Sequence, residues 1–205
     1  MKCIVLAALI VIGAPAAAQS WSIEAFVGDA YNFRTRLEVT DRGFSRSVRA
    51  DYQTRGLDTP LYYVLRAGRW QDHRAWEAAL IHHKIYLQNP PEGVSDLSIS
   101  HGFNIFAITR AARSGDWTWR VGAGPVITHA EATINRVRYD GPYRLSGAAI
   151  LAGGGPRFAL GERWFLSADL MATAAYARPK LSGDARIEAT NVAVHALVGI
   201  GAELR

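Results

Sequence analysis

AWEAALIHHKIYL (75–87) and LSISHGFNIFAITR (97–110) are the two runs that decide the fold, and the loop QNPPEGVSD (88–96) joins them. In both runs apolar and polar side chains alternate with a period of two. This is the pattern of a β-strand with one apolar and one polar face. Two such runs around a loop that contains Pro and Gly favour an antiparallel hairpin.

The register of this hairpin determines which side chains meet. If Leu87 pairs with Leu97, directly opposed residues share a face, so His83 lies opposite His101 and Lys84 opposite Ser100. The apolar face then contains Ile81, His83, Ile85, Leu87, Ile99, His101 and Phe103. The polar face contains His82, Lys84, Tyr86, Ser98, Ser100 and Asn104. We expect the apolar face to meet lipid and the polar face to be enclosed.

The N-terminal residues 1–18 have the pattern of an export signal. Lys2 precedes a short apolar run, and small residues end the segment at Ala18, after which we expect cleavage. The single cysteine, Cys3, lies inside this segment. Residues 19–205, which we expect to form one domain, therefore offer no thiol for a disulfide, a nucleophile or a metal site.

The charge of residues 19–205 is mild. Without Lys2 there are 22 basic and 18 acidic side chains, a net charge of +4. The charges are dispersed and accompany no nucleic-acid-binding motif, so we expect no nucleic acid among the partners.

Eight further alternating runs accompany the central hairpin, with Gly28-Asp29 as a tight-turn signal between the first two. These runs cover 21–27, 31–40, 43–55, 60–70, 117–128, 143–158, 163–177 and 191–205. Tight turns and longer loops alternate between the runs. The pattern predicts an all-β, antiparallel up-and-down transmembrane barrel of about ten strands, with eight as the alternative, and with both termini on one side.

The aromatic residues sort to the two ends of the predicted strands. All six Trp fall near the tight turns, and all eight Tyr fall near the longer loops. Amphipathic rings at two levels are typical of a protein that crosses a bilayer with two interfaces.

Residues 19–205 resemble the small bacterial outer-membrane β-barrel proteins. The resemblance rests on the export signal, the alternating strands, the aromatics at both rims and the ending VGIGAELR (198–205). This ending is similar to the assembly signal in the last strand of such barrels, with Leu204 where an aromatic residue is usual. The resemblance implies a Gram-negative outer membrane as the location and the barrel-assembly machinery as a partner.

An apolar exterior would leave ionic side chains of both signs in the lumen. The side chains with that parity are Glu24, Arg34, Arg36, Glu38, Arg49, Asp51, Arg66, His82, Lys84, Arg120, Asp169, His195 and Glu203. Interleaved opposite charges predict a closed interior of ion pairs with no wide pore.

The polar face of the hairpin offers one catalytic hypothesis. A serine nucleophile such as Ser100 can be activated by a neighbouring base, here Lys84. The ligand-binding candidates nearby are His82, Tyr86, Ser98, Asn104 and Arg66. The alternative is an ordinary Lys–Ser hydrogen bond in the barrel wall.

His83 and His101 offer a second hypothesis on the apolar face. Imidazoles turned toward lipid are costly unless they reach the headgroups, so the pair would lie near the phosphates and acyl esters of the outer leaflet. Outer-membrane lipid A deacylases have a His-x-Ser pattern on one strand face. This chain has Phe103 two residues after His101, so only a β-bulge could restore such a site.

Neither a metal ion nor another cofactor is expected from the sequence. Adjacent histidines on a strand point to opposite faces, so His82, His83 and His101 do not converge without distortion.

Three functions remain open at this point. The first is a non-enzymatic outer-membrane barrel whose surface loops, around 88–96, 129–142 and 178–189, contact lipopolysaccharide or an external partner. The second is a hydrolase of lipid A or phospholipid with its site on the 82–104 hairpin. The third is a periplasmic, lipocalin-like barrel that binds an apolar ligand. The first is the preferred hypothesis, and the oligomeric state is left open.

Overall fold

The computed structural model describes residues 19–204, so the predicted export signal lies outside the described residues. Within this range the regular elements are thirteen strands of one antiparallel sheet. No helix in this range is long and apolar enough to cross a membrane.

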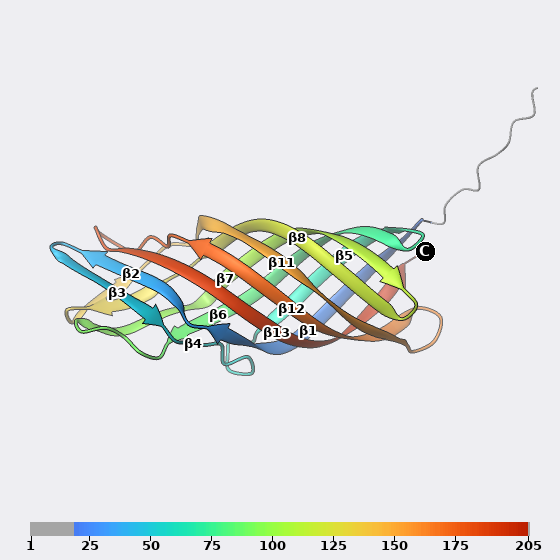
Figure 1. Ribbon diagram of the computed structural model, residues 1–205, viewed down its shortest axis with the longest axis horizontal. Coiled ribbons are helices and arrows are strands. Elements are labelled where there is room, and N and C mark those ends of the chain that lie inside the picture. Colours follow the sequence, from blue (N-terminus) through green and yellow to red (C-terminus); the bar gives the residue numbers. More distant parts are fainter. Residues whose placement is uncertain (1–18, 205) are drawn as a thin grey trace, which may run out of the picture.

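Eight long strands form a closed ring (Figure 1). They are β1 (Gln19–Phe33), β5 (Tyr63–Gln71), β6 (Arg74–Leu87), β7 (Val94–Ser114), β8 (Trp117–Thr128), β11 (Arg144–Ala159), β12 (Trp164–Ala177) and β13 (Arg186–Leu204). Each strand pairs with the next one in this series, and β1 also pairs with β13. The antiparallel barrel predicted from the sequence is confirmed, and the ring has the smaller of the two strand counts.

Five short strands extend the wall beyond the ring at one end. They are β2 (Thr35–Asp41), β3 (Phe44–Ala50), β4 (Tyr52–Gln53), β9 (Glu131–Ile134) and β10 (Val137–Asp140). The count of about ten strands treated the runs that contain β2 and β3 as strands of the ring. They form a hairpin of their own, and β2 continues the wall beside β13.

The predicted tight turn at Gly28-Asp29 is wrong, because β1 runs straight through these residues. A Cβ atom at Gly28 would collide with the carbonyl oxygen of Ala196 on β13. This glycine therefore permits a close approach of two strands and does not form a turn.

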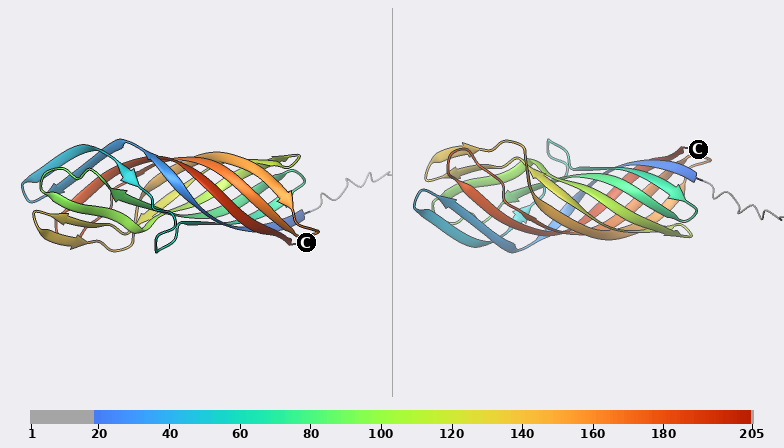
Figure 2. Two further views of the ribbon diagram at one scale, coloured as in Figure 1. Left: turned by 90° about the horizontal axis from the view of Figure 1, so that it is seen from below. Right: turned by 90° about the horizontal axis from the view of Figure 1, so that it is seen from above.

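The two ends of the barrel differ in their connections (Figure 2). Three short turns, at residues 72–73, 115–116 and 160–163, lie at the same end as Gln19 and Leu204, the first and last described residues. The four longer connections, which include the five short strands, lie at the other end, called the loop end below. The alternation of tight turns and longer loops is thus confirmed.

Tryptophans surround the turn end of the barrel. The exposed ones are Trp21, Trp76, Trp117, Trp119 and Trp164. Trp70 points inward and donates a hydrogen bond to Ser22 Oγ over 2.9 Å. Trp76 was expected in the lumen, but 61% of its surface is exposed on the outer wall.

Tyrosines form a second level toward the loop end, where Tyr31, Tyr143 and Tyr176 are exposed and Tyr52 and Tyr62 are buried. Trp21 and Tyr31 are ten residues apart on β1. Ten steps of about 3.3 Å at a strand tilt of roughly 45° span about 23 Å, close to the height of the apolar band on outer-membrane barrels. Between the two levels the outer wall exposes Ile23, Val27, Leu65, Phe106, Ile108, Val121, Ile150, Leu166, Leu170, Val194, Val198 and Ile200.

The expected facing of the central hairpin is wrong. The apolar set of β6 and β7 points inward, and Ile81, Ile85, Ile99 and Phe103 are completely buried. Toward the loop end, these side chains join an apolar core that also contains Leu37, Val39, Leu97, Ile134, Leu181 and Ile187. The opposite face of this part of the hairpin is polar, and its side chains His82, Lys84, Ser98 and Ser100 are buried in the wall.

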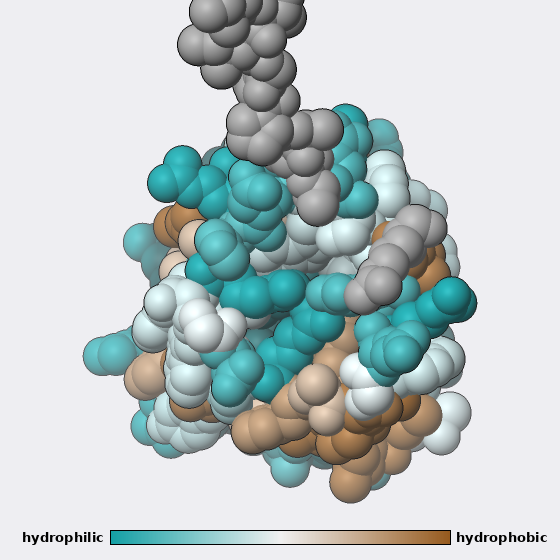
Figure 3. Space-filling view, turned by 90° about the vertical axis from the view of Figure 1, so that its right-hand side faces the viewer, coloured by the Kyte–Doolittle hydropathy of each residue, from teal (hydrophilic) through white to brown (hydrophobic). Residues whose placement is uncertain are grey.

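The interior near the turn end is polar instead. Viewed from this end, hydrophilic side chains gather over the middle of the molecule, and hydrophobic ones appear on its flank (Figure 3). The barrel is therefore apolar outside and ionic inside near its termini, and the arrangement reverses toward the loops.

Candidate functional site

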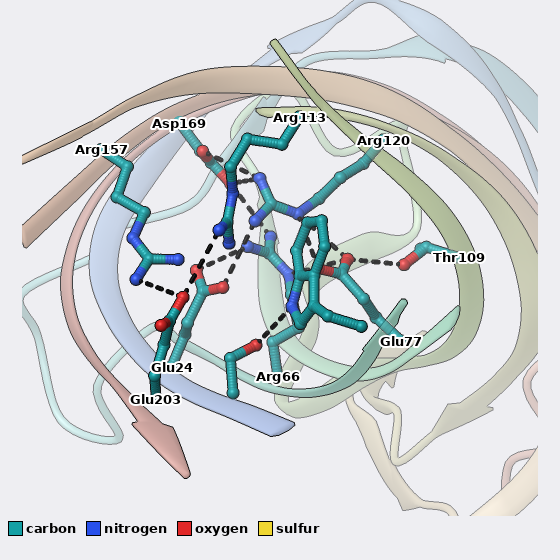
Figure 4. Close-up of polar contacts among 11 residues, drawn as sticks. Glu24, Arg66, Glu77, Thr109, Arg113, Arg120, Arg157, Asp169 and Glu203 are labelled. Carbon is teal, nitrogen blue, oxygen red and sulfur yellow. Dashed lines mark hydrogen bonds and ion pairs between the residues drawn. The ribbon is translucent and has the colours of Figure 1, made fainter. Parts of the chain in front are cut away.

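Two arginines and three carboxylates fill the barrel between the turn end and its middle (Figure 4). Arg66 of β5 contacts Glu24 over 3.1 Å, Asp169 over 3.0 Å and Glu77 over 3.8 Å. Arg120 of β8 contacts the same three carboxylates over 3.0 to 3.3 Å. At most 6% of any of these side chains is exposed. We call these five residues the ionic cluster.

A second group closes the lumen nearer the termini. Glu203 accepts contacts from Arg157 over 2.8 Å and from Arg113 over 3.4 Å. The guanidinium of Arg113 lies 4.1 Å from the ring centre of Trp70. Together with the ionic cluster, this gives four arginines and four carboxylates, so the buried charge sums to zero. Charges removed from water are tolerated when they are paired in this way.

The sequence predicted part of this interior. Glu24, Arg66, Arg120, Asp169 and His195 are buried in the lumen as expected, and Glu203 lies at its mouth. The other charged candidates lie toward the loop end, outside the lumen: Arg34, Arg36 and Arg49 are exposed, Glu38 and Asp51 are partly exposed, and His82 and Lys84 are buried in the wall.

Glu77 is the main residue that sequence reasoning missed. The facing assumed for β6 placed it against lipid, whereas its side chain is completely buried in the lumen. The shared parity of Trp76, Ala78 and Leu80 is the signal that could have found it. These three side chains mark the outer face, which assigns Glu77 to the interior.

A layer of neutral polar side chains separates the ionic cluster from the apolar core. His195 hydrogen-bonds with the Tyr62 hydroxyl through Nδ1 over 2.8 Å and with Thr173 Oγ1 through Nε2 over 2.9 Å. Asn32 Oδ1 lies 3.2 Å from His83 Nε2 and accepts a hydrogen bond from Asn191 over 2.8 Å. Both buried histidines therefore serve structural hydrogen bonds.

The predicted pairing of His83 with His101 is wrong. Near the loop, Ile85 pairs with Ile99, as the expected register requires, but an irregularity between His83 and Ile85 shifts the pairing by two residues. His83 consequently lies opposite Phe103 and is completely buried inside. The His101 side chain is 54% exposed on the outside, so the two imidazoles do not share a face.

The predicted Lys84–Ser100 pairing is also wrong. Lys84 is fully buried, and its Nζ donates hydrogen bonds to the carbonyl oxygens of Arg55 and Asp58 over 2.6 and 2.8 Å. These carbonyls belong to the loop between β4 and β5. The ammonium group therefore donates its hydrogen bonds to the backbone of that loop and does not activate Ser100.

Ser100 has a different histidine neighbour. Its Oγ lies 3.4 Å from Nδ1 of His101, and Glu131 Oε1 lies 3.7 Å from the same nitrogen. In a catalytic triad the serine hydroxyl contacts one ring nitrogen of the histidine, and the carboxylate that orients the ring contacts the other nitrogen. The arrangement of these three side chains is therefore not that of a catalytic triad.

The ligand-binding candidates do not converge on one cavity. His82 and Asn104 are directly paired, with 2.7 Å between Nδ1 and Oδ1, and His82 stacks on Tyr63 at 4.8 Å. Tyr86 pairs with Ser98 and lies 4.5 Å below the guanidinium of Arg55. Arg66 belongs to the ionic cluster inside the barrel.

The loop end has an excess of unpaired positive charge. Seven exposed cations in segments 34–62, 88–96, 129–144 and 178–188 form no ion pair with any residue between 19 and 204: Arg46, Arg49, Arg55, Arg136, Arg144, Lys180 and Arg186. In the same segments and the same described range, the carboxylates without an ion pair to Lys or Arg number five: Asp41, Asp58, Glu92, Asp96 and Asp140.

The loop-end segments also contact one another. Tyr139 of β10 donates a hydrogen bond over 2.5 Å to Asp41 at the end of β2. This bond, with a smaller contribution from burial, raises the pKa of Tyr139. This bond thus joins the β9–β10 hairpin to the β2–β3 hairpin.

Comparison with known proteins supports the fold. No family model matches the sequence, and no curated protein matches it. The outer membrane protein OprG from Pseudomonas aeruginosa is similar in structure, with a TM-score of 0.51 and 12% identity over 92% of this chain and 97% of that one. Neisserial surface protein A gives a TM-score of 0.41 with 12% identity, over 90% of this chain and 98% of that one. The attachment invasion locus protein Ail of Yersinia pestis gives 0.41 with 14% identity, over 90% and 99%. At these identities the similarity to OprG shows a shared fold alone.

Proposed function

We propose that this chain is a non-enzymatic bacterial outer-membrane β-barrel that does not conduct ions and whose loop end binds the anionic groups of lipopolysaccharide. The observation that carries the proposal is the set of seven exposed, unpaired cations on the loop-end segments. Lipopolysaccharide presents phosphates and carboxylates at the level where such a surface would emerge from the outer leaflet. Arginine recognises these groups well because its planar guanidinium can donate two parallel hydrogen bonds.

The membrane location is supported by the outer wall. Large apolar side chains cover it between a Trp level and a Tyr level, at a spacing close to the thickness that a bilayer requires. A water-soluble barrel would expose this whole belt to solvent, where extended apolar patches cause association. The belt therefore argues against the lipocalin-like alternative. The similarity in fold to an outer-membrane protein agrees with this location.

The absence of conduction is supported by the packing of the lumen. The void beside the ionic cluster, bordered by Arg66, Arg120, Asp169, Leu151 and Met171, has a volume of about 10 Å³. Such a void holds no more than about one water molecule. Toward the loops, the apolar core and the polar layer fill the remaining cross-section.

The proposal can be tested with folded, tag-free protein in detergent micelles titrated with purified lipopolysaccharide. Replacing Arg46, Arg49 and Arg136 together by Gln should weaken binding roughly tenfold, since each exposed charge pair contributes about 0.2–1 kcal/mol. The matched control replaces Arg69, Arg74 and Arg163 by Gln, which removes the same charge from the turn end. Equal binding by both triple variants would refute the proposed surface.

The hydrolase alternative has its own test. Because His101, Ser100 and Glu131 lack the arrangement of a triad, expression of the protein should leave the acyl chains of lipid A unchanged. Mass spectrometry of lipid A and phospholipids from cells with and without the protein measures this directly. A shortened or missing acyl chain would favour the hydrolase over the binding protein.

A further inference from the structure

Three side chains with metal-binding donor atoms converge on the loop-end half of the barrel wall: His101 of β7, His129 between β8 and β9, and Glu131 of β9. A fourth, Asp140 of β10, lies beside His129. The donor atoms of His101, His129 and Glu131 all lie within 4.8 Å of one another. Glu131 Oε1 is 3.7 Å from both His101 Nδ1 and His129 Nε2, and Asp140 Oδ1 is 3.0 Å from His129 Nε2.

These separations match those between ligands of one metal ion. Zinc binds imidazole nitrogen and carboxylate oxygen at about 2.0–2.2 Å, so tetrahedral ligands lie roughly 3.4 Å apart. Three of the donor separations differ from that value by less than half an ångström. The donors of the two histidines lie within 4.8 Å of each other, so rotations of the exposed His101 and Asp140 side chains would complete the arrangement around an ion.

The backbone holds the four residues in this arrangement. Gly102 has φ +149°, and this turns His101 outward while Phe103 points inward. The amide of His129 donates a hydrogen bond over 3.1 Å to the carbonyl of Gly102, which joins the two histidine-bearing segments. Glu131 and Asp140 are directly opposed residues of the β9–β10 hairpin. A preorganised site of this kind loses little entropy when it binds a ligand.

His129 is the member of the group whose ring nitrogens lack hydrogen-bond partners among residues 19–204. Only 18% of its side chain is exposed, yet neither ring nitrogen makes a hydrogen bond with any residue between 19 and 204. Buried polar atoms are rarely left without a partner. A metal ion coordinated by Nε2 would remove this deficit on one side of the ring.

The charges around the group suit a cation. Arg138 contacts Oε2 of Glu131 over 3.2 Å, which leaves Oε1 directed toward the histidines. With neutral imidazoles, two carboxylates and one guanidinium give a net charge of −1. Two nitrogen and two oxygen donors favour a transition ion over calcium or magnesium, which prefer oxygen donors alone.

We infer that His101, His129, Glu131 and Asp140 form a binding site for one divalent transition-metal ion of the Zn²⁺ class. His101 Nδ1, His129 Nε2 and one oxygen of each carboxylate supply the ligands. Because these residues come from β7, the β8–β9 segment, β9 and β10, the ion would fix the β9–β10 hairpin to the barrel wall.

The test uses tag-free folded protein, treated with a chelator and titrated with ZnCl₂ by isothermal calorimetry. The expected result is one saturable site that is weakened at least tenfold in both His101→Ala and His129→Ala. The matched control is His73→Ala, which removes an exposed histidine from a turn at the opposite end and should bind Zn²⁺ like the unaltered chain. Saturable binding of equal strength in all four proteins would overturn the inference, as would no saturable binding to the unaltered chain.

Two further measurements guard against a folding defect. Glu131→Gln retains the size of the side chain and should also weaken Zn²⁺ binding, with the folded fraction checked by heat-modified gel mobility. Limited proteolysis should show that Zn²⁺ protects the 129–142 segment in the unaltered chain and in His73→Ala, but not in His101→Ala. Protection by Zn²⁺ that persists in His101→Ala would contradict the assignment.

Discussion

At the scale of single residues, Glu77 shows how one buried carboxylate supports the whole interior. It contacts both arginines of the ionic cluster and accepts a hydrogen bond from Thr109 over 2.9 Å. No other side chain of β6 neutralises these arginines within residues 19–204. Its removal would leave buried positive charge without full compensation, which is more costly than losing an exposed ion pair.

Replacing Glu77 by Ala should lower the free energy of unfolding by about 3 kcal/mol or more. Urea titration of the protein in lipid vesicles, followed by tryptophan fluorescence, measures the change. Glu162→Ala, an exposed carboxylate in a tight turn, serves as the control and should stay within about 0.5 kcal/mol of the original protein. If both variants unfold at the same urea concentration, the ionic cluster does not carry the stability assigned to it.

Lys84 gives a second prediction at this scale. Replacing Lys84 by Met removes both hydrogen bonds to the 55–58 carbonyls but keeps most of the buried chain length. The barrel should remain folded, while the loop between β4 and β5 should be cleaved faster by protease because its carbonyls have lost their partner. Mass spectrometry of the fragments locates the cut. An unchanged cleavage rate would show that the loop is held by other contacts, such as the close approach of Gly56 to Gly28.

At the scale of elements, the positions of the long strands could be read from the sequence, but the facing of β6 and β7 could not. A period of two divides each strand into two faces, but it does not say which face meets water. In β6 the exterior changes from apolar at Ala78 to polar at His82, while the interior changes from Glu77 to Ile81 and Ile85. The rule that the apolar face meets lipid therefore holds only near the turn end, and applying it at Ile81 and Ile85 inverted the expected facing of the whole strand.

The sequence pattern also did not predict the β-bulge between His83 and Ile85 in this hairpin. The register near the 88–93 loop follows from the loop length, but the irregularity beyond Ile85 depends on Gly102 and on the packing of Phe103 opposite His83. His101 consequently leaves the apolar face and joins His129, which lies 28 positions later in the chain. Contacts between residues so far apart require the three-dimensional structure.

The facing of β6 and β7 can be measured directly. Residues 19–205 contain no cysteine, so single cysteines can carry a fluorophore that brominated lipids quench. Labels at Leu80 and Phe106 should be quenched strongly, because both side chains point outward between the Trp and Tyr levels. A cysteine at Ile81 should react with the fluorophore only after unfolding, since Ile81 is completely buried. The opposite outcome would restore the facing expected from the sequence.

At the scale of the whole molecule, the lumen divides into layers of different chemistry. The ionic cluster lies nearest the termini, the neutral polar layer follows, and the apolar core fills the loop-end half. The sequence predicted the closed interior, but not this layering, because β6 and β7 supply ten residues of the core and their apolar face was expected to meet lipid.

This packing predicts that the protein will not support a steady ionic current. A planar bilayer containing the folded barrel should show the conductance of the bare membrane at both voltage polarities, and a porin of known conductance provides the positive control. Discrete, long-lived current steps that scale with the amount of protein would contradict a filled lumen.

The pairing of β1 with β13 has a consequence for biogenesis. Along one edge of β1, thirteen residues from Trp21 to Phe33 pair with Val192 to Leu204 of β13. This edge of the first strand therefore stays unpaired until the last strand is in place. Until this seam closes, both edges expose unsatisfied amides and carbonyls to any other chain nearby. Closure of the barrel is thus the last step of folding. Until then, the unclosed sheet must be kept from associating with other chains.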